Sequence, residues 1–246
     1  MKAQRNFLST TLFVLISCFS VSLLANTATA NMIVRITKLN DHSINLQVAN
    51  IQQRTEIKIV DLNGQPWFST VVKKTNAYAK QLNLSAIPTG NYIVYVKNDD
   101  EKHIQAFAKS SEEIAFFESS DKPATNYAYA QLASNRTKTS QRLITRVSTD
   151  GDKKVEVQLA NLMNKKTSVQ VRFLTGVELV RDQVRGEAGY AKSFNCEGMT
   201  AGDYYVVVRT GKTTFLQFFM INEAGIFMEE SQRLDNNPAK LDWAAK

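Results

Sequence analysis

The sequence predicts an all-β protein that contains two tandem β-sandwiches. Three observations support this fold class. Apolar residues alternate with polar ones along short segments, turn-forming residues recur between these segments, and the second half of the chain repeats the first at an offset of 112 residues. No segment shows sustained helical periodicity between capping residues. The strands are therefore expected to pair into sheets that share a core.

The repeat sets the expected domain boundaries. Positions from Thr55 to Glu118 match positions 112 residues later without a gap, and upstream the offset shifts to 111 and then 108, where loops are expected. The copy number is too low for a solenoid, and each copy is long enough for a core of its own. We therefore expect a signal peptide at 1–30, β-sandwich domain 1 at 31–118, a linker at 119–142, β-sandwich domain 2 at 143–230 and a polar tail at 231–246.

The strands of the first repeat follow in order from the alternation. Ser43 to Val48 alternates polar with apolar side chains, which is typical of a half-buried strand. Asn63-Gly64 is a strong hairpin signal, and Gly90 suits a positive φ in the corner before a valine-rich strand. The expected strands lie at 43–48, around Ile57 and Ile59, at Leu82 to Leu84, at Tyr92 to Val96 and at Ile104 to Phe107.

The first thirty residues have the pattern of a secretory signal peptide. Basic residues precede an uncharged apolar run from Phe7 to Leu24, and Ala28-Thr29-Ala30 supplies the small residues of a cleavage site. An uncleaved membrane anchor is one alternative. Lipidation of Cys18 is another, because Leu15-Ile16-Ser17-Cys18 is similar to a bacterial lipobox. We expect an exported protein, located in the periplasm, at the cell surface or outside the cell, with no transmembrane span in the mature chain.

Composition and charge exclude several classes of protein. With 246 residues, 10 Gly, 4 Pro and 43% hydrophobic residues, the chain is neither collagen-like nor disordered. The net charge of +7 falls to +5 when the signal peptide, with Lys2 and Arg5, is removed. Because opposite charges are interspersed, we expect no nucleic-acid partner. The mature chain keeps only Cys196, which excludes an intramolecular disulfide and is expected in the core.

The corner before the valine-rich strand carries a resemblance to a known family. Ile59 to Gly64 and Leu84 to Val96 contain a D-x-x-G hairpin followed by an L-x-x-x-P-x-G-x-Y-x-V-x-V corner and strand. This pattern resembles the C-terminal sorting domains of cargo of the Bacteroidetes type IX secretion system, which are small Ig-like sandwiches, and fibronectin type III domains share a similar corner. The resemblance implies two tandem Ig-like or fibronectin-like sandwiches; the second copy is looser, with Thr200 in place of the proline.

No constellation of residues predicts catalysis or a cofactor. His42 and His103 lack counterparts in the second repeat and are expected in exposed turns. The sequence has no Cys/His spacing for zinc and no glycine-rich phosphate loop. Asp99-Asp100-Glu101 and Asp150-Gly151-Asp152 offer oxygen atoms that suit calcium, but solvated turns are the favoured interpretation. We therefore expect a protein that is not an enzyme and that holds no cofactor or metal.

Trp67 and Phe68 form the first group of candidate ligand or interface residues. They follow the Asn63-Gly64 turn, and their counterparts Leu179 and Val180 are also apolar, which favours a core or interdomain role. An exposed aromatic platform for a sugar or peptide is the alternative.

The second candidate group lies on the segment from Thr213 to Ile221. This segment is long, uncharged and apolar, and we expect it to be the last strand, at an edge of the second sandwich. One of its faces enters the core, so the other is expected to pack on the first unit or on a partner; the linker or the tail from Leu234 to Trp243 is the alternative cover. The candidate interface residues are Leu216, Phe218 and Met220, or their neighbours Phe215, Gln217 and Phe219.

Together these observations predict an exported, non-enzymatic binding or scaffolding protein of the bacterial envelope or surface. A module for type IX sorting or anchoring is the first alternative, which the resemblance implies. A noncatalytic carbohydrate-binding protein is the second, and it depends on an exposed Trp67. We expect a protein partner at the envelope or surface, with a carbohydrate as the alternative ligand.

Overall fold

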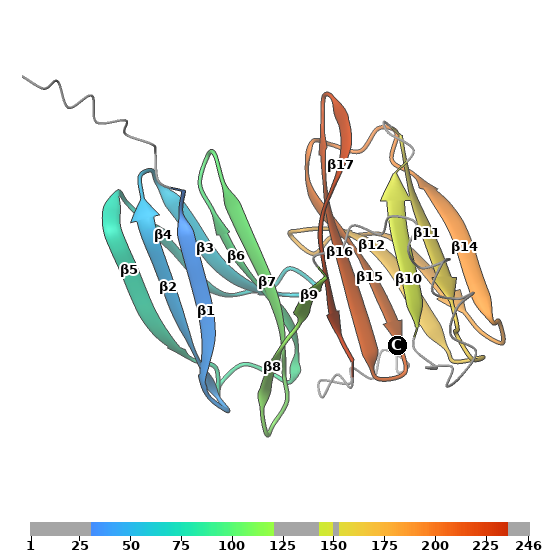
Figure 1. Ribbon diagram of the computed structural model, residues 1–246, viewed down its shortest axis with the longest axis horizontal. Coiled ribbons are helices and arrows are strands. Elements are labelled where there is room, and N and C mark those ends of the chain that lie inside the picture. The colour runs from blue at the N-terminus through green and yellow to red at the C-terminus, as the bar shows by residue number, and fades with distance from the viewer. Residues whose placement is uncertain (1–30, 121–142, 150–152, 236–246) are drawn as a thin grey trace, which may run out of the picture. The chain divides into compact units, whose positions relative to one another are not determined.

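The computed structural model describes residues 31–120, 143–149 and 153–235 (Figure 1). All regular elements in these ranges are β-strands, and the prediction of an all-β, Ig-like sandwich fold is confirmed. The predicted signal peptide with Cys18, the Asp150-Gly151-Asp152 turn and most of the predicted linker and tail lie outside the described residues. Within the described ranges, no helix is long and apolar enough to cross a membrane.

The first sandwich consists of two antiparallel sheets that enclose one core. Side chains at alternate positions of β2 and β6 point into this core, so each sheet buries one face against the other. One sheet has the order β1-β2-β5, with bounds Ile33–Asn40, Ser43–Ile51 and Thr75–Asn83. The other has the order β4-β3-β6-β7-β8, with bounds Pro66–Val72, Thr55–Asp61, Gly90–Lys97, Lys102–Lys109 and Ile114–Phe116.

The second sandwich repeats this plan and adds one strand. Its smaller sheet has the order β10-β11-β14, with bounds Ile144–Thr149, Lys154–Ala160 and Gly189–Asn195. Its larger sheet has the order β13-β12-β15-β16-β17-β9. The bounds of these six strands are Glu178–Val184, Thr167–Phe173, Gly202–Thr210, Thr213–Asn222, Gly225–Leu234 and Glu118–Ser120. The added strand, β9, comes from the end of the first repeat.

Residues at equivalent positions make the same hydrogen bonds in both sandwiches. The Tyr92 hydroxyl donates to the Pro88 carbonyl at 2.6 Å, and the Tyr204 hydroxyl donates to the Thr200 carbonyl at 2.5 Å. Burial, together with the charge of Asp61, raises the pKa of Tyr92 to about 12, so this hydroxyl keeps its proton at neutral pH. The corner thus forms with threonine as well as with proline, because the tyrosine bonds a backbone carbonyl.

Replacing Tyr92 or Tyr204 by phenylalanine is expected to lower the free energy of unfolding by about 1 kcal/mol, because each corner carbonyl loses its donor while the ring stays packed. Urea denaturation followed by circular dichroism measures this loss. Tyr78→Phe is the control, since its hydroxyl makes no hydrogen bond within the described residues. An equal loss in the control would contradict the role assigned to the corner.

Three details of the predicted strands are wrong. β16 is not an edge strand, because it pairs with β15 on one side and with β17 on the other. β17 runs to Leu234, so the first four residues of the predicted tail belong to the sheet. His103 lies within β7, where it is half-buried, rather than in an exposed turn. The described residues from Met32 onward belong to one compact unit, and the division into independent domains stays a prediction.

Candidate functional site

An apolar cluster lies between the two sandwiches, separate from the core of each. Tyr92 and Tyr204 point into their own cores, whereas the next residues, Ile93 and Tyr205, point into this cluster. β6 and β15 are therefore buried on both faces, which explains their nearly continuous apolar sequences. We call this the shared cluster, and its members are Val60, Leu62, Ile93, Tyr95, Ile104, Ala106, Ala108 and Phe117 with Leu174, Tyr205, Val207, Leu216 and Phe218.

The candidate residues of β16 divide between several environments. Leu216 and Phe218 are buried in the shared cluster, and the Phe218 ring lies 5.9 Å from the Tyr205 ring. Met220 is only partly buried and lies outside this cluster. Their neighbours Phe215 and Phe219 point into the core of the second sandwich. The assignment of Leu216, Phe218 and Met220 as interface residues to a partner stays a prediction.

Trp67 and Phe68 lie on the edge strand β4, in two different environments. Phe68 packs against the first core, with the Lys80 ammonium 5.0 Å from its ring centre. Trp67 is 40% exposed and makes an edge-on contact with Tyr92, with ring centres 6.5 Å apart. The two residues therefore form no common platform, and the assignment of either as a ligand residue stays a prediction.

One strand of the first repeat, β9, joins the larger sheet of the second sandwich. β9 pairs antiparallel with β17 of the second sandwich, with Glu118 opposite Arg233 and Ser120 opposite Ser231. At the equivalent position of the second repeat the chain stays in its own sheet, where Ser231 pairs with Gln217 of β16. The same position of the repeat thus pairs within its own sandwich in the second copy, but with the other sandwich in the first copy. The backbone bonds of β9 cross from the first repeat to the second.

Because β9 pairs with β17, it leaves backbone groups of β7 without a partner strand, and the Gln232 side chain bonds these groups instead. Its amide oxygen accepts from the Ala106 N–H at 2.8 Å, and its amide nitrogen donates to the Ile104 carbonyl at 2.8 Å. A side-chain amide therefore replaces a backbone peptide group at this sheet edge. Gln232 is 0% exposed, so it satisfies two backbone groups at a site closed to water.

The hairpin turns of the two repeats meet at their glycines. Gly64 has φ 81° and Gly176 has φ 90°, a region that glycine adopts without strain. A Cβ on Gly64 would overlap the Thr175 carbonyl oxygen, and a Cβ on Gly176 would overlap the Asn63 carbonyl. Each turn thus requires its glycine for two reasons, the positive φ and the close approach of the other turn.

A network of charged groups lies at another border of the shared cluster. The Asp203 carboxylate accepts from Lys102 at 2.5 Å, from Lys97 at 3.2 Å and from the Tyr95 hydroxyl at 3.2 Å. Lys102 also pairs with Glu229. Burial opposes the ionisation of Asp203, but the bond and charge of Lys102, with Lys97, outweigh it and lower the pKa of Asp203.

Replacing Asp203 by asparagine is expected to destabilise the protein at pH 7 by about 1–3 kcal/mol. The pKa of Asp203 is lower in the folded protein than in the unfolded chain, where it is about 4. The carboxylate therefore stabilises the fold at any pH above about 4, and this stabilisation is lost as the pH falls through the pKa of the folded state. The difference between wild type and variant should therefore shrink below about pH 4, as measured by urea denaturation across pH.

Asparagine is a matched replacement, because the first repeat carries Asn91 at the equivalent position. Asp99→Asn is the control, since Asp99 is exposed and its carboxylate makes no hydrogen bond or ion pair within the described residues, so this variant should follow wild type across pH. A pH-independent difference between wild type and Asp203→Asn would contradict the role given to the carboxylate.

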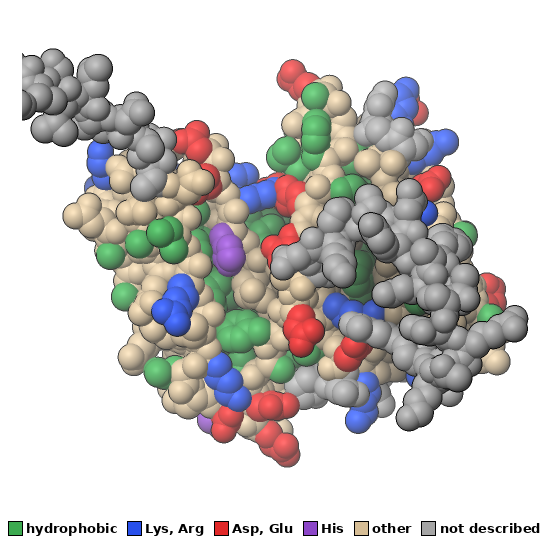
Figure 2. All heavy atoms as spheres, viewed as in Figure 1, with side chains coloured by type: hydrophobic (Ala, Val, Ile, Leu, Met, Phe, Trp, Pro, Cys, Tyr) green, Lys and Arg blue, Asp and Glu red, His purple; other side chains and the backbone are tan. Residues whose placement is uncertain are grey.

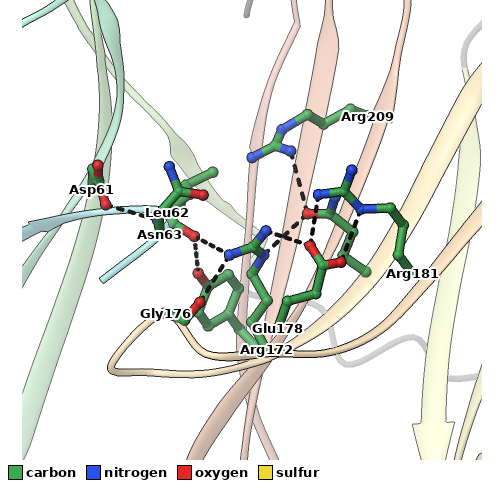
Figure 3. Close-up of polar contacts among 10 residues, drawn as sticks. Asp61, Leu62, Asn63, Arg172, Gly176, Glu178, Arg181 and Arg209 are labelled. Atoms are coloured by element: carbon green, nitrogen blue, oxygen red, sulfur yellow. Dashed lines mark hydrogen bonds and ion pairs between the residues drawn. The ribbon is translucent and has the colours of Figure 1, made fainter. Parts of the chain in front are cut away.

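A second polar group, centred on Arg172, contacts the first repeat directly (Figure 3). Arg172 Nη1 donates to the Leu62 carbonyl at 3.0 Å and to the Gly176 carbonyl at 2.8 Å. The Tyr205 hydroxyl donates to the same Leu62 carbonyl at 2.9 Å, and burial raises its pKa. The first repeat has Val60 in place of Arg172, so the repeat pattern gave no signal for this contact.

The remaining candidate residues do not gather as metal ligands among the described residues. No three His, Cys, Asp or Glu side chains within those residues come together as metal ligands would. Burial lowers the pKa of His103, against the opposing charge of Glu230. Cys196 lies in the core of the second sandwich. On the face in Figure 2, basic and acidic side chains are intermixed rather than gathered in one patch.

A known family matches the first sandwich. Residues 40–110 match the model of the secretion system C-terminal sorting domain, a stretch that includes β2 to β7. The resemblance that the Leu84 to Val96 corner carries is thereby confirmed. A search of the curated proteins found no similar sequence. Because the matched family sorts proteins for secretion, the match supports export of this chain to the cell surface or the outside.

Two solved structures are also similar to this chain. A biofilm-associated protein BSP domain has 11% identity and a TM-score of 0.23, over 82% of this chain and 29% of that one. The FN1–FN3 domains of chicken CNTN1 have 10% identity and a TM-score of 0.19, over 79% of this chain and 60% of that one. The chain spans less than two thirds of either structure, and at these scores neither likeness carries an argument.

Proposed function

We propose that the protein is an exported, non-enzymatic scaffolding or binding protein of the bacterial envelope or surface, in which both sandwiches act as one module. One observation carries this proposal. The outer face of the sheet that matches the sorting family, including Ile93, Tyr95 and Ile104, is covered by the second sandwich. A region similar to a sorting domain is thus built into a larger module that presents other surfaces.

The first test concerns export of the intact chain. The full-length protein with an epitope tag in the turn at Lys73-Lys74 is expressed in a Bacteroidetes host, and intact cells are treated with a membrane-impermeant label. We expect the mature chain to be outside the cytoplasm, with the tag labelled at the surface or after permeabilisation of the outer membrane. Retention of the chain in the cytoplasm would contradict the proposal.

A type IX sorting or anchoring module is the second candidate function, favoured by the match of residues 40–110. Residues 31–246 are fused to the end of a reporter that has its own signal peptide. Sorting predicts reporter delivery to the surface in cells with the type IX secretion system and loss of delivery without it. The scaffold proposal predicts no such dependence. Val94→Asp places a charge in the first core and should unfold the first sandwich. This control shows whether delivery requires a folded domain.

A further inference from the structure

Three arginines on neighbouring strands gather around one carboxylate in the second sandwich (Figure 3). Arg172, Arg181 and Arg209 extend from β12, β13 and β15, and Glu178 is the carboxylate that Arg172 and Arg181 share. Asp61, the other carboxylate in this view, accepts from backbone N–H groups of its own turn. The arginine cluster therefore carries more positive charge than the carboxylate beside it neutralises.

Two of the three guanidinium groups make strong hydrogen bonds to a carboxylate, and the third does not. Arg181 binds both oxygens of Glu178, at 2.9 and 2.8 Å. Arg172 donates to Glu178 and to two backbone carbonyls. Arg209 has one weak bond, from Nη1 to the Gln170 amide oxygen at 3.4 Å, and that oxygen already accepts from Arg172 at 3.1 Å.

The Nε of Arg209 is buried and has no hydrogen-bond partner among the described residues. Burial, with repulsion from Arg172 and Arg181, lowers its pKa to about 10, so the group is still a cation at neutral pH. Arg209 is partly buried beside two like charges, and Glu178 is the one acidic side chain that acts on its pKa. An anion at this point offsets the cost of desolvation and the repulsion. A guanidinium fork favours ligands with two acceptor oxygens.

We propose that Arg209, beside Arg172 and Arg181, is a binding site for an oxyanion group: the carboxylate, sulfate or phosphate of an acidic ligand. Because the Nε is closed to solvent, the oxyanion accepts from the two Nη groups of Arg209, the far end of a side chain that is only partly buried. Gln170 and Glu178 hold the neighbouring guanidinium groups in place. This site is independent of the proposed scaffold function, because binding of an oxyanion at Arg209 requires neither export of the chain nor a protein partner.

Isothermal titration calorimetry of the mature chain, residues 31–246, tests the site. Sodium sulfate, phosphate and acetate are each titrated at constant ionic strength, with sodium chloride as the reference anion. We expect saturable binding of at least one oxyanion and none of chloride, and the preferred anion identifies the ligand group. Absence of saturable binding with all three oxyanions would overturn the proposal.

Two variants and one control locate the binding. Arg209→Gln is expected to weaken binding at least tenfold, and Arg209→Lys, which keeps the charge without the fork, should weaken it as well. Arg185→Gln is the control, because Arg185 is an exposed arginine that follows β13, and it should bind like wild type. Unchanged binding by Arg209→Gln would overturn the site. The Arg209 Nε–H resonance of wild type, which should shift on titration, gives an independent readout that needs no variant.

Discussion

Replacing Phe218 by alanine is expected to lower the free energy of unfolding by about 3–5 kcal/mol. Phe218 is 1% exposed and fills the shared cluster beside Tyr205. Its removal leaves a cavity between the sandwiches and takes away dispersion contacts on both sides. Urea denaturation, followed by circular dichroism and tryptophan fluorescence, measures the loss.

Phe227→Ala is the matched control for this variant. Phe227 lies on β17, the strand next to Phe218, but is 45% exposed, so its truncation should cost less than about 1 kcal/mol. Amide hydrogen exchange then shows whether the Phe218→Ala variant destabilises both sandwiches or only the second. In Phe218→Ala, protection should fall at Ile93 and Tyr95 of the first sandwich as well as in β16. Loss confined to the second sandwich would show that Phe218 serves only its own domain.

The second large effect is expected at Gln232. Gln232→Ala leaves the Ala106 N–H and the Ile104 carbonyl buried without partners, and each unsatisfied group costs about 1–3 kcal/mol. We therefore expect a loss of about 2–6 kcal/mol in the free energy of unfolding. Hydrogen exchange of the Ala106 amide should accelerate, because the Gln232 oxygen that accepts its hydrogen bond is removed.

Gln217→Ala is the control for Gln232, since Gln217 donates to the Phe218 and Glu229 carbonyls within the second sandwich. Its truncation should destabilise the second sandwich and leave the Ala106 amide protected. If the Ala106 amide stays equally protected in Gln232→Ala, the side-chain amide does not close the edge of β7 and this part of the account is wrong.

Local sequence patterns predicted the strands and the corners well. The alternation from Ser43 to Val48 and the Leu84 to Val96 corner are encoded within a few residues, where side-chain period and turn chemistry act directly. The long, uncharged and apolar sequence of β16 also indicated that this strand has a second apolar face to cover. The apolar residues at Leu216 and Phe218 gave that signal, because a strand with one solvated face alternates instead.

The contacts between the sandwiches were beyond the reach of the repeat. β9 and the end of β17 occupy equivalent positions but pair with different strands, because long-range pairing depends on what else is near rather than on local sequence. Gln232, Arg172 and Asp203 each make side-chain contacts across this junction. Their equivalents in the first repeat are different residues, such as Val60 and Asn91, so comparison of the copies gave no warning.

We infer that the shared cluster, β9 and Gln232 hold the two sandwiches as one rigid body. Residual dipolar couplings of backbone amides in residues 32–120 and 153–235 of the mature chain measure whether they do. We expect a single alignment tensor to fit both sets of couplings, and we expect Phe218→Ala or Gln232→Ala to make the two sets diverge. Two unequal tensors in the wild-type protein would mean that the sandwiches move independently and that these contacts do not hold them together.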